Sequence, residues 1–295
     1  MSADHFAQYL LSGLTQGSVY ALVGLGFAII FTVTGIINFA QGEFVMLGGI
    51  FSYIFFTSLG LPLVPSVVLS VVAATAIGCM LYLLGIRPAR KASTISLIII
   101  TIGAAIFIRG VVGEFWGRDF VRPPHFTGND PVSLMGASID PQRLWIIGTV
   151  FAVTIILHIF LSYTMVGKAL RACSVNRLGA TLVGIDFKTM ALIAFALAAA
   201  IGAVAGIVVS PLTTVWVNSG IMLGLKGFVA AAIGGFRSPL LAVVGGLTLG
   251  IIESFAVAAD WGPLSSAYKD AIALAVLILI LSIRASRLAA EERAS

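Results

Sequence analysis

The residues best suited to carry chemistry in this sequence are three polar side chains that lie close to several glycines. Asn38, Gln41 and Glu43 fall between or just inside two long apolar runs. They form either a tight turn in which polar groups cap helix ends, or a polar site that lines a path or a gate. An ionisable residue in a membrane span is costly and usually faces the interior of the helix bundle. Glu43 therefore favours the second interpretation, and we predict that the three residues lie near such a path.

A second carboxylate, Glu253, lies late in the apolar run 239–259. Lining the path, pairing with a basic residue and sitting at the membrane interface are all open to it, and we include it among the candidate path residues. Arg109 and Lys226 also lie in apolar surroundings. Because long basic side chains can bury their stems while the charge reaches water, both are predicted to snorkel outward.

Residues 165–188 form a basic segment between two apolar runs. Leucine, valine and glycine recur in it at spacings typical of a short amphipathic helix with glycine at its ends or kinks. Its four basic residues, Lys168, Arg171, Arg177 and Lys188, stand against one acid, Asp186. The pattern favours a docking surface. The alternative is that the basic residues only orient the chain and face anionic lipid.

The composition shows which elements must position these residues. Hydrophobic residues make up 59% of the 295 residues and charged residues only 10%, whereas a soluble domain has about a quarter charged residues. The sequence is therefore that of a polytopic membrane protein. The net charge of +5 is no nucleic-acid signal, because the basic residues sit in short loops. The two cysteines lie far apart in the sequence and support no disulfide framework.

A helix needs about 20 mostly apolar residues to cross the hydrocarbon core. The sequence predicts such spans near 10–33, 40–59, 63–86, 95–113, 144–164, 189–209, 239–259 and 267–284. The short, glycine-rich piece 222–236 is compatible with a short or broken crossing and with a re-entrant segment. The predicted fold is an all-α transmembrane helical bundle of about nine spans, with eight as the alternative.

The loop charges predict the orientation of the bundle. The loop at 87–94, the segment 165–188 and the C-terminal tail with Arg284, Arg287 and Arg293 are basic, whereas the loop 114–143 balances acids against bases. We therefore place 114–143 outside and 165–188 in the cytoplasm. Three spans before a cytoplasmic 87–94 loop put the N-terminus outside. A cytoplasmic C-terminus then requires an odd number of spans, which favours nine.

Several motifs are absent from the sequence. It has no G-x-x-x-x-G-K-[ST] phosphate loop, no G-x-S-x-G elbow and no H-E-x-x-H pair, and no cluster with metal-ligand spacing. We therefore expect no enzyme, no metal site and no cofactor bound by this chain.

Three blocks of sequence resemble the permease subunits of the branched-chain amino-acid ABC importers. They are GSVYALVGLGFAIIFTVTGIINFAQGEFVMLGG, KALRACSVNRLGATLVGIDFKTM and LKGFVAAAIGGFRSPLLAVVGGLTLGIIESF, and together they extend over nearly the full chain. The resemblance implies a single permease domain, residues 1–295, in the bacterial inner membrane. It also implies a periplasmic loop at 114–143 and a cytoplasmic coupling loop at 165–188. Related permeases carry urea, short amides or sugars, so the substrate stays open.

The resemblance further implies partners. These are a second, related permease or a second copy of this chain, two cytoplasmic ATPase subunits that use the ATP, and a periplasmic binding protein that delivers the substrate. The best candidates for contact with the ATPase are Arg171, Asn176, Arg177, Ala180 and Gly184. A self-sufficient secondary transporter or channel, and an integral membrane enzyme, are the rival interpretations.

Overall fold

A computed structural model describes residues 3–89, 92–128, 130–134, 137–258, 270–280 and 282. The α-helices are α1 (Ala3–Thr34), α2 (Gln41–Ser52), α3 (Leu63–Met80), α4 (Thr94–Phe115), α5 (Pro141–Tyr163), α6 (Met165–Val175), α7 (Arg177–Leu182), α8 (Phe187–Val209), α9 (Ser219–Gly234) and α10 (Pro239–Ala258). Two π-helical segments, η1 (Tyr53–Ser58) and η2 (Leu81–Ile86), continue α2 and α3. A further short apolar helix extends over Asp270–Ile280.

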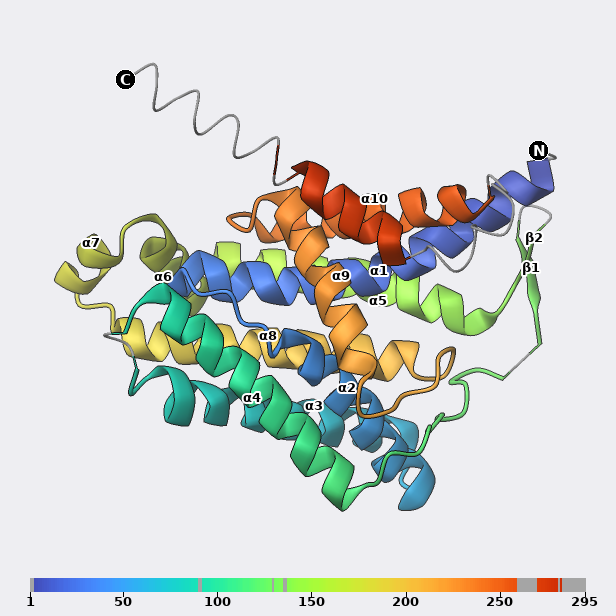
Figure 1. The fold of residues 1–295 in the computed structure, drawn as a ribbon, viewed down its shortest axis with the longest axis horizontal. Helices are drawn as coiled ribbons and strands as arrows, with labels where there is room; N and C mark the ends of the chain where they lie inside the picture. Colours follow the sequence, from blue (N-terminus) through green and yellow to red (C-terminus); the bar gives the residue numbers. More distant parts are fainter. Residues whose placement is uncertain are drawn as a thin grey trace.

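The bundle is organised around two central helices, α1 and α8. Helix α1 packs against α10, α8, α9 and α5, and α8 packs against α2 and α3 as well. Figure 1 shows α1, α5, α8 and α10 running roughly side by side, with α3 and α4 on the opposite flank. Most of α1 and α8 is buried, whereas only a minority of the residues of α3, α4 and α5 are buried. Exposed apolar faces on outer helices are what a lipid environment requires.

Among the described residues, six helices are long and apolar enough to cross a membrane. Helix α9 has 16 residues and α2 has 12, so each falls short of that length by itself. The glycine-rich piece 222–236 thus lies largely in a continuous, short helix. The tail residues Arg284, Arg287 and Arg293, and Arg90 and Lys91 of the 87–94 loop, lie outside the described part of the chain.

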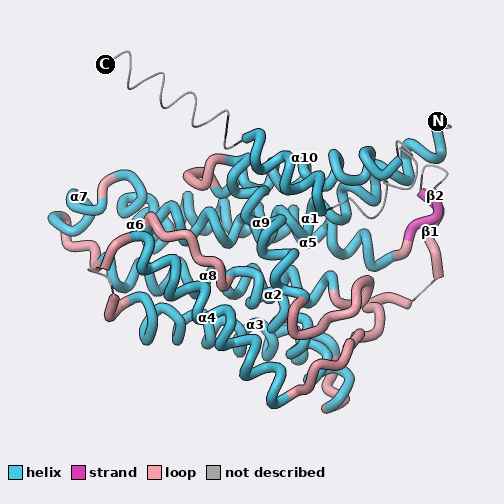
Figure 2. The backbone as a smooth tube through the Cα atoms, in the orientation of Figure 1, coloured by secondary structure: helices cyan, strands magenta, loops and turns pink. Residues whose placement is uncertain are grey.

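A break separates α1 from α2. Helix α1 ends at Thr34, and Gly35 follows with a φ of +72°, a conformation that suits glycine. Residues 36–38 then have no regular structure, and a turn at 39–40 precedes α2. The backbone amide of Phe39 donates to the Thr101 hydroxyl of α4, at 3.1 Å. Figure 2 shows this connection as a loop that runs into the interior of the bundle.

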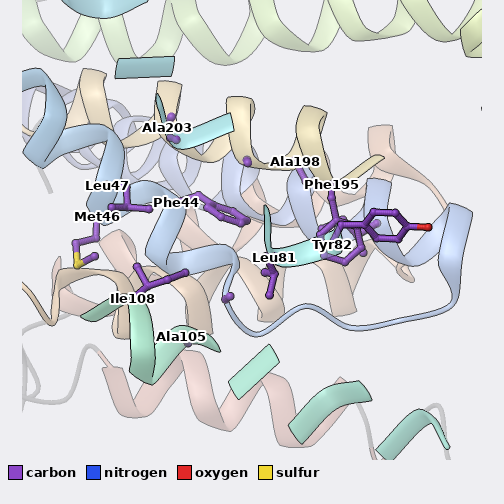
Figure 3. Packing of buried hydrophobic residues seen from close by; sticks show 14 of the residues in the cluster. Phe44, Met46, Leu47, Leu81, Tyr82, Ala105, Ile108, Phe195, Ala198 and Ala203 are labelled. Atoms are coloured by element: carbon purple, nitrogen blue, oxygen red, sulfur yellow. The ribbon is translucent and has the colours of Figure 1, made fainter. Parts of the chain in front are cut away.

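Glycines allow α2 to lie very close to its neighbours. A Cβ atom on Gly48 would overlap the carbonyl oxygen of Ala203 in α8, and one on Gly206 would overlap that of Val45 in α2. Small residues permit this close approach of helices, which is a main source of stability in lipid. Figure 3 shows Phe44 of α2 packed close to Phe195 and Ala198 of α8 in the core.

The loop between α4 and α5 contains a short antiparallel hairpin, β1 (Val132–Leu134) with β2 (Ala137–Ile139). The sequence predicted only helices, so this hairpin was missed. The loop is tied to the α8–α9 connection by a bridge between Val121 and Val215. Backbone pairing needs no long apolar run, and three-residue strands leave little pattern in a sequence.

Candidate functional site

The three predicted path residues at the start of α2 lie together and are buried inside the chain. Asn38 and Gln41 are fully buried, and Glu43 is 2% exposed. The Asn38 side-chain oxygen accepts a hydrogen bond from the amide of Ala40 at 3.1 Å, and so helps to end the break. The Gln41 amide donates to the carbonyl of Ala198 in α8 at 2.9 Å. These hydrogen bonds show that the groups shape a turn and hold α2 to α8. Their place near a path stays a prediction.

Each of these residues keeps one polar atom without a hydrogen-bond partner in the described part of the chain. The atoms are Asn38 Nδ2, Gln41 Oε1 and Glu43 Oε2. A buried polar atom without a partner costs about 1–3 kcal/mol. Native structures leave few buried polar groups unpaired, so three such atoms beside one helix break call for an explanation. Unpaired buried polar groups of this kind are expected at functional positions.

Glu43 pairs with Arg109 of α4. The Arg109 Nε atom lies 3.6 Å from Glu43 Oε1. Arg109 therefore directs its charge into the bundle, and the prediction that it snorkels outward was wrong. The reason is that the Glu43 carboxylate on α2 stabilises the charge of the guanidinium. A side chain directed outward would instead place that charge among apolar groups.

Glu253 belongs to a second group of interacting side chains. It is fully buried, and its Oε1 atom lies 3.1 Å from Lys226 Nζ of α9. The Tyr20 hydroxyl of α1 donates to Glu253 Oε2 at 2.8 Å. Lys226 Nζ also lies 2.8 Å from Asp270 Oδ1. Of the three interpretations open to Glu253, pairing with a basic residue is the one observed.

Lys226 is only 5% exposed, so the prediction that it snorkels was wrong. The sequence carries no signal for this network, because the three residues stand on three different helices. Tyr20 lies 206 residues from Lys226 and 233 from Glu253. Only an ionisable residue in an apolar run marks such a position. Tyr20 carries no such mark and was missed.

Helix α9 lies beside both groups of polar residues. A Cβ atom on its Gly220 would lie 3.0 Å from Glu43 Oε2, while Lys226 reaches Glu253 from the same helix. Gly42 of α2 lies against Gly220 and Gly224. The structure thus brings together Asn38, Gln41 and Glu43, and it places Glu253 in a separate network on α9 and α10.

The basic segment forms two short helices, α6 and α7, where the sequence predicted one. Asn176 is extended, and its side-chain oxygen accepts a hydrogen bond from the amide of Gly179 at 2.9 Å, which caps α7. Gly184 follows α7 with a φ of +89°. Ala180 is buried against the bundle. Three of the five predicted coupling residues therefore shape the segment.

The two arginines among the predicted coupling residues make local contacts. Arg171 Nη2 donates to the Ser162 hydroxyl at 3.1 Å. The guanidinium carbon of Arg177 lies 3.5 Å from the centre of the Phe187 ring, which is a cation–π contact. Arg177 thus connects the first residue of α7 with the first residue of α8.

The apolar residues of the segment do not share one buried face. Leu170 is 1% exposed, but Leu178, Leu182 and Val183 are 72%, 80% and 77% exposed. Together with Val175, which is also exposed, these three form what we call the α7 apolar face. The amphipathic pattern indicated the helices but misplaced these side chains, which point away from the bundle. An exposed apolar patch of this kind marks an interaction site.

Asp186 begins α8 and is held in its charged form. The Thr189 hydroxyl donates to Asp186 Oδ2 at 2.7 Å, and the amide of Lys188 donates to Oδ1 at 3.1 Å. These hydrogen bonds lower the pKa of the Asp186 carboxyl below its ordinary value. A charged N-cap fixes where the segment ends and α8 starts.

Within the described residues, no group of three or more His, Cys, Asp or Glu side chains could hold a metal ion. The polar atoms are grouped as buried ion pairs and as unpaired groups around a broken helix. Such a bundle, with ionisable residues in its interior and a basic segment at one end, defines a helical membrane transport protein.

Comparisons with known proteins give the family. The chain belongs to the family described as branched-chain amino acid transport system / permease component, whose pattern matches residues 9–281. It is 34% identical to the high-affinity branched-chain amino acid transport system permease protein LivH of Escherichia coli K12, over 94% of this chain and 93% of that protein. It is 33% identical to the corresponding BraD permease of Pseudomonas aeruginosa, over 95% and 94% of the two chains. The resemblance predicted from three sequence blocks is confirmed.

More distant matches agree with this. The probable branched-chain amino acid transport permease LivH of Methanocaldococcus jannaschii is 28% identical over 93% of this chain and 89% of that protein. The solved structure of PsaBC from Streptococcus pneumoniae in complex with Fab shares the fold, with a TM-score of 0.51 over 95% of both chains at 12% identity. The chain is therefore a membrane permease component, as predicted.

Proposed function

We propose that this chain is the permease subunit of an ATP-driven importer of branched-chain or related small neutral amino acids in a bacterial inner membrane. Its relatives from E. coli and P. aeruginosa are named as permeases of high-affinity branched-chain amino acid transport systems. The sequence has no phosphate loop, so the ATP is hydrolysed by separate subunits. A periplasmic binding protein delivers the substrate.

The observation that carries this proposal is the α7 apolar face. Helices α6 and α7 lie at one end of the molecule, and the β1–β2 hairpin lies at the other, as Figure 1 shows. Apolar side chains that face water are unfavourable unless another surface covers them. A short, capped helix that docks in a partner can transmit the partner's movement to α5 and α8 as a rigid-body motion. Basic residues near the face add electrostatic complementarity.

The same arrangement supports the proposed orientation in the membrane. With α6 and α7 in the cytoplasm, the hairpin and the N-terminus, which lie at the opposite end in Figure 1, face outside. Nine crossings result when α2 with η1, α9 and the helix Asp270–Ile280 are counted with the six long helices. An odd number puts the C-terminus in the cytoplasm.

The break before α2 is the proposed gate region of the path. Asn38, Gln41 and Glu43 have unpaired polar atoms there, and these atoms can bind a polar substrate group or water once α2 and α9 separate. Broken helices suit a binding site of this kind, because they supply free backbone and side-chain groups near the middle of the membrane. Glu253 acts at a distance, by fixing α9 through Lys226.

The partners of the proposed complex are a second permease, either a relative or another copy of this chain, two ATPase subunits and the binding protein. Transport in proteoliposomes tests the proposal. The chain, co-purified with its ATPase, is expected to take up leucine, isoleucine or valine only when ATP and the binding protein are both present. Uptake by the chain alone, without ATP, would instead show a self-sufficient transporter or channel.

The substrate class is tested by the same assay. Uptake of urea or a short amide in place of branched-chain amino acids would show an ATP-driven importer with a different substrate.

The conservative variant Glu43→Gln is expected to lower the uptake rate about tenfold while the complex still assembles, because the buried carboxylate is lost from the gate region. Unchanged uptake by this variant would remove Glu43 from the path.

A further inference from the structure

A pocket of about 240 Å³ lies where α6 meets the turn between α9 and α10. Arg171 and Ser174 of α6 line one side, and Arg237 and Ser238 of the turn line the other. Its inner wall is apolar and includes Val33 of α1. The pocket is smaller than the roughly 300–1,000 Å³ of a typical small-molecule site, so it suits the headgroup of a larger molecule.

The two arginines of this pocket have no acidic partner within the described residues. Arg171 donates to the Ser162 hydroxyl, and the salt bridges found in the described part involve neither Arg171 nor Arg237. Their guanidinium groups are therefore available to an external anion. The Ser174 hydroxyl donates to the Arg171 carbonyl at 2.7 Å, whereas the Ser238 hydroxyl only accepts, from the amide of Leu241. Two arginines and the Ser238 hydroxyl around one hollow form a donor set that suits a phosphate group.

The apolar wall of the pocket continues onto the outer surface of the bundle. Helices α5 and α10 both pack on α1, and Val33 of α1 lies between them at the inner wall. On α5, Leu157 and Leu161 line the pocket, and on α10, Pro239 and Leu240 line it. Leu240 is also 44% exposed, so the apolar wall reaches the outer surface of the bundle beside the arginines.

We propose that this pocket binds an anionic phospholipid, with its phosphate held by Arg171 and Arg237 and its acyl chains lying along α5 and α10. Basic pockets between helices at the cytoplasmic membrane surface bind such headgroups. A soluble phosphate compound would not account for the apolar wall that extends from the pocket to the exposed Leu240. A partner protein is instead expected to dock on the α7 apolar face. The residues of that face, Val175, Leu178, Leu182 and Val183, are distinct from those of the pocket.

This site does not depend on the substrate of the importer. It joins α6, which carries the proposed coupling segment, to the turn that starts α10. A lipid bound there would hold the coupling segment against the bundle, because one headgroup would bridge two elements that have different neighbours.

The test uses the full chain, with whichever subunits co-purify, in detergent after removal of native lipid. Native mass spectrometry measures binding of dioleoyl phosphatidylglycerol, with dioleoyl phosphatidylcholine as the zwitterionic comparison. The variant Arg171→Gln/Arg237→Gln is expected to bind phosphatidylglycerol about thirtyfold more weakly, since each basic residue near a headgroup contributes about 1 kcal/mol. Lys168→Gln, which removes a charge from α6 outside the pocket, is the matched control and is expected to bind like the natural chain.

Three results would overturn the proposal. One is that the double variant binds phosphatidylglycerol as tightly as the natural chain does. This holds also when the variant loses its ATPase partner, because the arginines would then contact the ATPase and not a lipid. Another is an equal loss in Lys168→Gln. The third is displacement of the lipid by millimolar inorganic phosphate, which would show a soluble anion as the ligand. Should the double variant fail to insert, Arg237→Gln alone, in an exposed turn, is expected to weaken binding severalfold, and no change there also overturns the site.

Discussion

Lys226 of α9 and Glu253 of α10 form a buried ion pair, with 3.1 Å between Nζ and Oε1. Tyr20 of α1 donates to the same carboxylate, so the pair connects three helices. Two charges in an apolar bundle are tolerated only when each satisfies the other. The pair therefore fixes how α9 sits against α1 and α10, and α9 in turn contacts the gate region at Gly220.

Replacing Lys226 with methionine should destabilise the protein strongly. Methionine is unbranched and nearly as long as lysine, but it leaves Glu253 buried without the cation of Lys226. Breaking a buried pair by removing one partner costs about 3–5 kcal/mol. Thermal unfolding in detergent, followed by loss of monodisperse protein in size-exclusion chromatography, measures the effect.

The double variant Lys226→Met/Glu253→Gln is the control for this prediction. It removes both charges, and the amide oxygen of the new glutamine can still accept a hydrogen bond from Tyr20. We expect it to recover most of the lost stability, because neither charge of the original pair is left alone. A double variant no more stable than Lys226→Met would show that the lysine acts through packing and not through charge.

Substitution of Gly206 tests the close packing of α2 on α8. The variant Gly206→Val places a side chain against the Val45 carbonyl, and overpacking of this kind costs about 1–3 kcal/mol or more. Lower yield and a lower unfolding temperature are expected. Gly103→Val in α4 is the matched control, since a Cβ there meets nothing within 4 Å. Equal losses in both variants would contradict the packing argument.

Charges placed on the α7 apolar face should uncouple ATP hydrolysis from transport. In Leu178→Asp/Leu182→Asp, two exposed leucines are replaced where no buried contact is lost, so the chain should still insert. Uptake is expected to fall at least about tenfold, since two anchors of a partner interface each contribute over 1 kcal/mol. The ratio of ATP hydrolysed to substrate transported measures this. Thr181→Ala, a change on the same helix outside the apolar face, is the matched control and should leave the ratio unchanged.

The turn after α7 gives a separate test of the coupling segment. Gly184 has a left-handed backbone, so Gly184→Asp is expected to shift α7 and to lower coupled transport severalfold, with insertion retained. Charge reversal in Arg177→Glu removes the contact with Phe187 and should have the same result. Asparagine tolerates this backbone better than most residues, so Gly184→Asn is the milder comparison. Wild-type uptake in both Gly184→Asp and Arg177→Glu would remove the support for a coupling role.

The stability of the N-terminal end of α8 is expected to depend on pH through the Asp186 carboxyl. Hydrogen bonds from Thr189 and Lys188 lower its pKa in the folded protein. The charged form therefore stabilises the folded state above the unfolded pKa of about 3.9, and this contribution is lost as the pH falls through the folded pKa. Thr189→Ala, which removes the largest cause, should raise the pKa toward its ordinary value. Carboxyl ¹³C shifts of aspartate-labelled protein measure it, and an unchanged titration would contradict the assignment.

The class of protein and most of its helices follow from the sequence alone. Apolar runs of sufficient length can fold in lipid only as helices, because each must satisfy its own backbone groups. The ranges 63–86, 95–113, 144–164, 189–209 and 239–259 accordingly recur as helices with nearly the same ends. The polar residues at the break, Asn38, Gln41 and Glu43, were also recognisable, since polar and charged residues stand out between apolar runs.

What each charge meets depends on the tertiary structure. Arg109 and Lys226 were predicted to reach outward, and both turn inward to carboxylates on other helices. Leu178 and Leu182 were part of an amphipathic pattern, yet they face away from the bundle because Ala180 takes the buried side of α7. Periodicity fixes which residues share a helix face, but the direction of that face depends on how distant helices pack. That packing is set by contacts between residues that the sequence keeps far apart.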